Sequence, residues 1–193
     1  SEVDRDYETL SVMTYNIHSG FDVVFRLKIN EMIQEIKKHR PDILCLQEVS
    51  YTEMYEHIKK SIGYTSGVYN DNKCIMTDGN IQRFSYVYFD PLRFYRKSGF
   101  IVADITLNNT DITVINSHLT SDISLFKQEA EIKELKEYIN ANKLNEQKLI
   151  VAGDFNYPDL ELCGYVINNF PEQLRLEQIK TGCTFPSWMP IIH

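Results

Sequence analysis

The chain has 193 residues, 43% of them hydrophobic, and a formal net charge of −7 at pH 7. This size and apolar content can bury the core of one domain, and because no Pro- or Ser-rich linker interrupts it, we expect a single domain over residues 1–193. The acidic balance excludes a protein that coats nucleic acid through a broad basic surface, and we expect no transmembrane segment because no apolar stretch reaches 18 residues.

Strands and helices alternate along the predicted elements. Apolar runs and alternations predict strands at 12–18, 41–48, 100–107, 112–119 and 149–152. Apolar residues at helical spacing predict helices at 25–40, 52–62 and 125–139. The mixture predicts an α+β protein built as a two-layer β-sandwich flanked by helices, that is, four layers in the order α/β/β/α.

Polar side chains stand at or just after the carboxyl ends of four predicted strands. They are Asn16, Glu48, His118, and Asp154 together with Asn156. Loops that follow core strands commonly carry functional sites, and one sheet or a pair of sheets can bring these ends together. The combined carboxylate, amide and imidazole groups predict a site for a hard cation and a phosphate.

A magnesium ion is the expected cofactor, with Mn²⁺ as a substitute. Glu48 and Asn16 offer carboxylate and carbonyl oxygens, and Mg²⁺ takes few protein ligands beside waters and phosphate oxygens. A structural zinc ion is not expected, because the four cysteines show no C-x-x-C pairing and no histidine at zinc-finger spacing. Cys45 lies within an apolar strand and is interpreted as a core residue.

Each site residue also has a structural interpretation when it is considered alone. Asn16 can hold a turn at a strand end, and Glu48 can cap the helix that follows it. His118 can be a structural histidine, and Asp154 can form an Asx turn with Asn156. The functional hypothesis therefore depends on all five residues occurring together.

Four short motifs, in their order along the chain, resemble those of the endonuclease/exonuclease/phosphatase superfamily, which includes deoxyribonuclease, abasic-site endonucleases and neutral sphingomyelinases. Each motif lies at the end of a predicted strand or just after it, and a Thr-Phe-Pro segment follows the last motif. They are Tyr15–His18 with Gly20, Leu46–Glu48, Asn116–Leu119, Gly153–Asn156 and the trailing Thr184–Pro186. The resemblance runs from about Leu10 to the last residue.

The resemblance implies a metal-dependent phosphodiesterase. Glu48, with Asn16 beside it, would hold Mg²⁺, and His118 would contact a phosphate oxygen. Asp154 and Asn156 would orient the attacking water, with Asp154 accepting its proton or aligning the group that does. Gln47 would support the metal ligand through a hydrogen bond.

One departure from the family pattern concerns the end of the sequence. The family continues into an Ile-Asp strand and a Ser-Asp-His motif whose histidine commonly acts near the scissile phosphate. The sequence ends at His193, before both, and His193 is not assigned that role. We therefore expect a chain truncated at its C-terminus, lacking that strand and that motif.

The substrate is expected to be a nucleic acid. A phospholipid head group or phosphoinositide is the alternative, and a catalytically incomplete binding or regulatory remnant is a third. Basic and aromatic residues between Arg83 and Lys97, Arg93 and Tyr95 among them, suit phosphate contact and base stacking, although an ordinary pair of strands explains them equally well. A cytoplasmic location is expected, although a signal peptide removed earlier would leave no trace, and the sequence does not indicate an oligomeric state.

Overall fold

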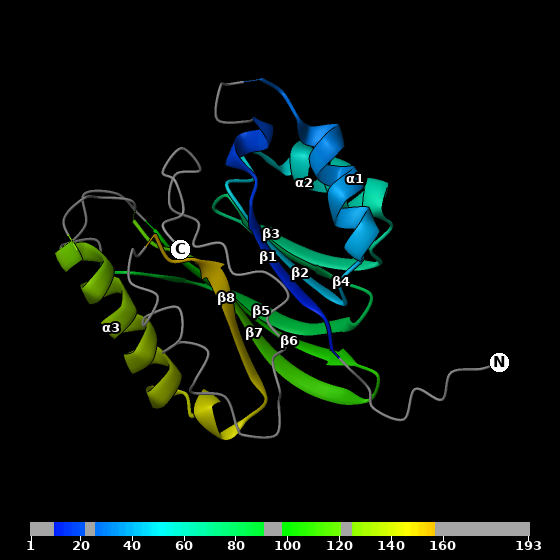
Figure 1. Ribbon diagram of the computed structural model, residues 1–193. Coiled ribbons are helices and arrows are strands. Elements are labelled where there is room, and N and C mark those ends of the chain that lie inside the picture. The colour runs from blue at the N-terminus through cyan, green and yellow to red at the C-terminus, as the bar shows by residue number, and fades with distance from the viewer. Residues whose placement is uncertain (1–9, 22–25, 91–97, 121–124, 157–193) are drawn as a thin grey trace, which may run out of the picture.

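The computed structural model describes residues 10–21, 26–90, 98–120 and 125–156. Two four-stranded sheets lie face to face, with two helices on the outer side of one sheet and one helix on the outer side of the other (Figure 1). This is the predicted α+β sandwich in four layers, α/β/β/α.

The first sheet is formed by the part of the chain up to Thr77. Its strand order is β1-β2-β4-β3, with β1 parallel to β2 and the other pairs antiparallel. The strands are β1 (Val12–Asn16), β2 (Ile43–Gln47), β3 (Ser66–Asn70) and β4 (Lys73–Thr77), and the helices are α1 (Ile29–His39) and α2 (Thr52–Ile62). Because α1 connects two parallel neighbours, β1-α1-β2 is a crossover unit.

The second sheet is formed by residues 80–154 and has the order β5-β6-β7-β8. Its first three strands are antiparallel, and β8 is parallel to β7. The elements are β5 (Asn80–Tyr88), β6 (Gly99–Leu107), β7 (Thr110–His118), α3 (Leu125–Ala141) and β8 (Leu149–Asp154). A second crossover unit, β7-α3-β8, therefore lies in this sheet.

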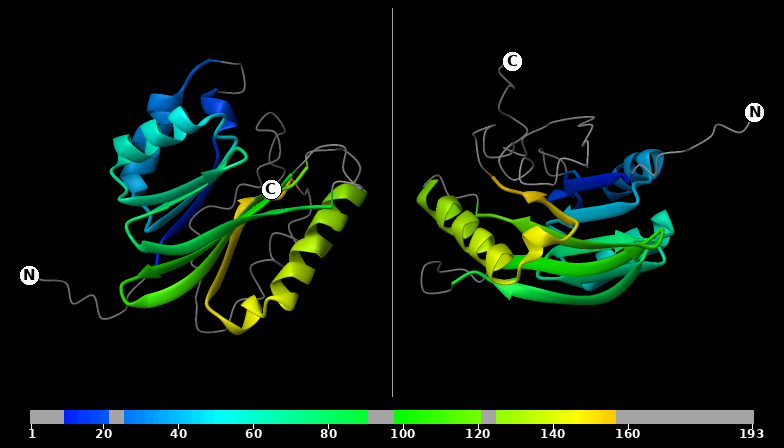
Figure 2. Two further views of the ribbon diagram at one scale, coloured as in Figure 1. Left: turned by 180° about the vertical axis from the view of Figure 1, so that it is seen from behind. Right: turned by 90° about the horizontal axis from the view of Figure 1, so that it is seen from below.

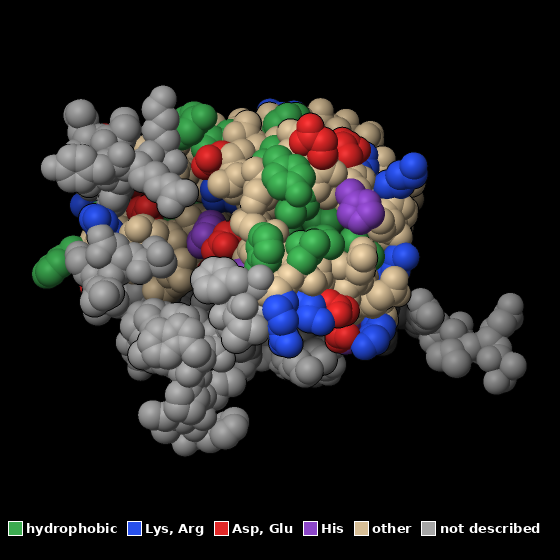
Figure 3. All heavy atoms as spheres, turned by 90° about the horizontal axis from the view of Figure 1, so that it is seen from above, with side chains coloured by type: hydrophobic (Ala, Val, Ile, Leu, Met, Phe, Trp, Pro, Cys, Tyr) green, Lys and Arg blue, Asp and Glu red, His purple; other side chains and the backbone are tan. Residues whose placement is uncertain are grey.

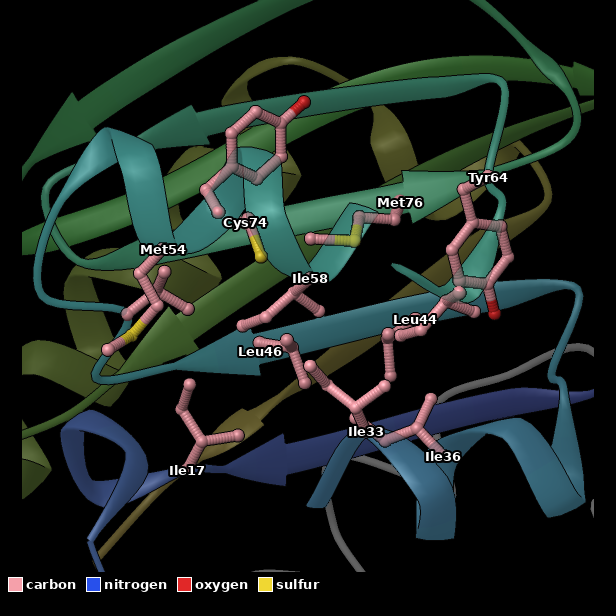
Figure 4. Close-up of a cluster of buried hydrophobic side chains, with 13 residues drawn as sticks. Ile17, Ile33, Ile36, Leu44, Leu46, Met54, Ile58, Tyr64, Cys74 and Met76 are labelled. Atoms are coloured by element: carbon pink, nitrogen blue, oxygen red, sulfur yellow. The ribbon is translucent and has the colours of Figure 1, made fainter. Parts of the chain in front are cut away.

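Three apolar clusters hold the four layers together. The first joins α1 and α2 to the outer face of their sheet through residues such as Ile33, Ile58 and Leu46 (Figure 4). The second fills the space between the sheets, where Cys45 is fully buried as expected. The third packs Ile132 and other residues of α3 against the far side of the second sheet, and Figure 2 shows α3 on that side.

The two crossover units place four strand ends at one edge of the sandwich. In a parallel pair both carboxyl ends point the same way, so β1 and β2 end together, as do β7 and β8. The strands of one pair pack against those of the other across the inter-sheet core. The polar residues at these four ends therefore meet.

The predicted elements occur with small changes, and β5 corresponds to the strand alternative given for Arg83 and its neighbours. The first strand ends at Asn16, and His18 already has a left-handed φ of 46°. The first helix begins at Ile29, just after Phe21 pairs with Leu27 and Lys28 N–H donates to Gly20 O. The hairpin β3–β4 was not predicted. None of the described helices is both long enough and apolar enough to span a membrane.

Candidate functional site

Asn16 joins the two carboxylates of the site. Its side-chain nitrogen donates to Glu48 Oε1 at 2.8 Å and to Asp154 Oδ2 at 2.9 Å, so one amide connects the first sheet to the second. Its oxygen accepts the backbone N–H of His18 at 2.9 Å, which fixes the orientation of the amide. Asn16 thus fills the predicted turn role and also directs the two carboxylates.

Two imidazoles lie on either side of Glu48. His118 Nε2 is 3.9 Å from Glu48 Oε1 and 3.8 Å from Asp154 Oδ2. On the other side, His18 Nδ1 lies 3.6 Å from Glu48 Oε2. The sequence motif contained His18 but gave it no role, and the structure places it in contact with the site. On the face viewed from above, histidine and acidic side chains are visible with exposed hydrophobic side chains next to them (Figure 3).

Asp154 is held more rigidly than Glu48. It is 1% exposed, and its second oxygen accepts the backbone N–H of Asn156 at 3.1 Å, the predicted Asx turn. Asn156 in turn donates its side-chain N–H to Leu119 O at 2.8 Å, next to His118. Gly153 permits this close arrangement, since a Cβ there would lie 2.1 Å from Ser117 O on the neighbouring strand.

Three site residues have left-handed backbone conformations. The φ angles are 46° at His18, 58° at Glu48 and 46° at Asn156. L-residues pay roughly 1–2 kcal/mol in this region, and such strain tends to accumulate where function requires a particular side-chain direction. Glu48 does not cap α2, whose N-cap residue Tyr51 makes no side-chain cap bond. The alternative structural role proposed for Glu48 is therefore absent.

A buried amide pair supports the site from below. Gln47 Nε2 donates to Asn116 Oδ1 at 2.7 Å, and Asn116 Nδ2 donates to the carbonyl oxygens of Leu46 at 2.9 Å and Cys74 at 2.8 Å. These bonds join β2 and β4 of the first sheet to β7 of the second, one residue before Glu48 and two residues before His118. Gln47 thus fixes the strand that carries Glu48 rather than contacting the Glu48 side chain.

The donor set fits a magnesium ion. Within the described ranges, no three His, Cys, Asp or Glu side chains form a cluster that would enclose a metal by themselves. Magnesium needs no such enclosure, because it is held by one or two carboxylates and keeps waters and phosphate oxygens. The Glu48 side chain is 34% exposed and thus accessible at the mouth of the site, while Asn16 holds its inner oxygen.

Several residues singled out from the sequence lie away from the site or outside the described residues. Arg83 pairs with Asp104 on the neighbouring strand, in line with the ordinary-strand interpretation. Arg93, Tyr95, His193 and the Thr184–Pro186 segment lie outside the described residues.

Comparisons with known proteins identify related sequences and folds. The sequence model of the Endonuclease/Exonuclease/phosphatase family matches residues 13–176, whereas no curated protein matches the chain at a significant level. The fold is similar to that of sphingomyelinase C from Streptomyces griseocarneus, with a TM-score of 0.67 and 15% identity over 84% of this chain and 70% of that one.

Two further solved structures share the fold. Truncated TDP2 from Caenorhabditis elegans gives a TM-score of 0.66 and 17% identity over 78% of this chain and 63% of that one. TDP2 from D. rerio, complexed with a single-strand DNA product, gives a TM-score of 0.65 and 19% identity over 86% of this chain and 67% of that one. The chain thus spans less than two thirds of the C. elegans protein, and identities this low establish a common fold only.

Proposed function

Because the chain belongs to the Endonuclease/Exonuclease/phosphatase family, whose members hydrolyse phosphodiester bonds, we propose that it is a magnesium-dependent nuclease. One observation carries the proposal: a single amide, Asn16, holds the carboxylates of Glu48 and Asp154, and the His118 imidazole lies within 4 Å of both. Carboxylate and imidazole groups are thereby gathered at one point from four strand ends.

Glu48 is the proposed metal ligand. A magnesium ion bound there would supply positive charge to the phosphate oxygens, and manganese would substitute for it. The chain's own contribution is to fix the ligand before the substrate arrives. Asn16 holds one oxygen of Glu48 and the left-handed backbone at residue 48 sets the direction of the side chain.

His118 and Asp154 act at the phosphate in this proposal. An N–H of the His118 ring donates to a phosphate oxygen and stabilises the negative charge that grows there. Both oxygens of Asp154 already accept hydrogen bonds, from Asn16 and from Asn156 N–H, and the residue is buried. These contacts favour an aligning role for Asp154, which would orient the attacking water together with Asn156, close to His118 Nε2 at 3.8 Å.

A nucleic acid is the proposed substrate class. Tyr51 follows Glu48 by three residues and Tyr88 ends β5 at the same edge of the second sheet as His118, and both rings are more than half exposed. Aromatic rings beside a phosphate site suit base stacking. The similar D. rerio TDP2 structure holds a single-strand DNA product.

Hydrolysis with and without magnesium tests the proposal. Glu48→Gln exchanges a charge for an amide of equal size, so it should abolish magnesium-dependent activity and leave the fold intact. Glu53→Gln, on the exposed face of α2, is the matched control and should behave like the parent. Full activity of Glu48→Gln at limiting magnesium would overturn the metal assignment.

The substrate class is tested by a panel of single-stranded DNA, duplex DNA, RNA, sphingomyelin and phosphoinositides. We expect a nucleic acid to be cleaved. Hydrolysis of the lipids alone would refute the choice of substrate and leave the phosphodiesterase proposal standing.

A further inference from the structure

A buried carboxylate in α3 lies outside the set of residues described so far. Glu131 is 0% exposed, although it belongs to a helix whose other face is solvated. One of its oxygens accepts the backbone N–H of Thr120 at 2.8 Å, and the other accepts the Ser98 hydroxyl at 3.0 Å. The side chain therefore links α3 to the segment just after β7 and to the residue just before β6.

The segment held by Glu131 follows His118 directly. Leu119 N–H donates to Asp154 O at 2.9 Å and Leu119 O accepts from Asn156 Nδ2 at 2.8 Å, which ties this residue to β8. Thr120, the next residue, is tied to α3 by Glu131. The two residues after His118 are thus fixed from opposite sides, by the site on one side and by the helix on the other.

Burial of this carboxylate carries a cost that an apolar residue would avoid. Desolvation raises the pKa of Glu131, which shows that the surroundings disfavour its charged form, even though the Thr120 and Ser98 bonds act in the opposite direction. One helical turn further, Glu134 accepts the backbone N–H of Asp90 at 2.8 Å, just after β5. The inner face of α3 thus holds two chain segments that leave the second sheet near the site.

We propose that Glu131 is a positioning residue for His118: by holding Thr120 against α3, it keeps the imidazole directed at the substrate phosphate. The inference rests on the phosphodiesterase proposal for the site. Glu131 itself contacts neither the metal ligand nor the reacting atoms, so its effect passes through the backbone of residues 118–120.

Two substitutions separate the hydrogen bonds of Glu131 from its charge. Glu131→Ala removes both bonds and should lower kcat roughly tenfold to a hundredfold with little change in KM, since small displacements of a reacting group have effects of this size. Glu131→Gln retains both bonds, because its amide oxygen accepts from Thr120 and its NH₂ donates to Ser98 Oγ. It should restore activity close to that of the parent.

Glu129→Ala, at an exposed position of the same helix, is the matched control and should leave kcat and KM unchanged. If Glu131→Ala does not fold, Ser98→Ala removes one of the two bonds and should give a smaller loss of kcat. A fully active Glu131→Ala enzyme, or a Glu131→Gln enzyme as impaired as Glu131→Ala, would overturn the proposal.

A double-mutant cycle asks whether Glu131 acts through His118. If it does, adding Glu131→Ala to His118→Ala should cause little further loss of kcat, whereas additive losses would refute the coupling. Amide hydrogen exchange tests the contact without an activity assay. Glu131→Ala should speed exchange of the Thr120 amide, and an unchanged exchange rate would show that Glu131 does not hold Thr120. A parent protein without hydrolytic activity would contradict the proposed function, while the exchange result would still decide whether Glu131 holds Thr120.

Discussion

Replacing Asn16 with alanine removes the amide that joins the two carboxylates of the site. Hydrogen bonds to charged groups contribute about 1.5–3 kcal/mol each. Asp154, at 1% exposure, has no access to water in place of the lost donor, so the full loss applies to that bond. The Glu48 side chain, at 34% exposure, regains hydration and loses less. We therefore expect the free energy of unfolding to fall by roughly 2–4 kcal/mol.

Urea unfolding at pH 7 in the presence of a chelator measures this loss. Asn80→Ala, an exposed position at the start of β5, is the control and should change stability by less than about 0.5 kcal/mol. Added magnesium should restore part of the stability of Asn16→Ala, because a bound cation supplies the positive partner that the amide no longer provides. A loss no larger than that of Asn80→Ala would show that the amide does not hold the two carboxylates.

Further predictions concern the chemistry, the cysteines and one buried acid. Asp154→Asn should slow hydrolysis of a small generic phosphodiester as well as of nucleic acid. Tyr88→Ala should raise KM for nucleic acid only, and an equal rise in KM for the small phosphodiester would contradict a stacking role for Tyr88. Burial raises the pKa of Cys45 to about 12 and that of Cys74 as well, so peptide mapping should find neither alkylated by iodoacetamide until the protein unfolds. Burial raises the pKa of Glu131, so the folded protein binds the proton of this carboxyl more tightly than the unfolded chain does. The resulting contribution to the free energy of unfolding is present at low pH and is lost as the pH rises through the folded-state pKa. Glu131→Gln should therefore gain stability relative to the parent with rising pH in urea unfolding, and a pH-independent difference would refute this.

The strands that carry the site were predictable because each ends in an abrupt change from apolar to polar residues. The run before Asp154 and the run before Glu48 are apolar enough to predict buried strands, and the polar residues after them mark the strand ends. Parallel pairing then determines that these ends meet. The α2 helix was predicted over the observed range, Thr52–Ile62, because its apolar residues keep helical spacing throughout.

Other features leave no signal in the sequence. The β3 strand contains Gly67 and exposes part of both faces, so its alternation is weak. β4 begins with Lys73 and ends with Thr77, which leaves an apolar run of only three residues to mark it as a strand. Glu131 stands among other acidic and basic residues of a helix, where periodicity predicts a solvated side chain; only the tertiary arrangement buries it. The direction of the Asn16 amide likewise depends on groups 32 and 138 residues away.

The division of the chain between its two sheets has a consequence for how the site comes into being. Residues 12–77 form one sheet and residues 80–154 the other, and only Asp78 and Gly79 connect them. Each half can complete its own ladder of backbone hydrogen bonds, yet neither half holds more than one of the carboxylates that Asn16 joins. A molecule whose halves have folded separately is still without a site. The candidate site is therefore assembled only where the two sheets dock, so a change that loosens the contact between the sheets should separate Glu48 from Asp154 even where each ladder stays intact.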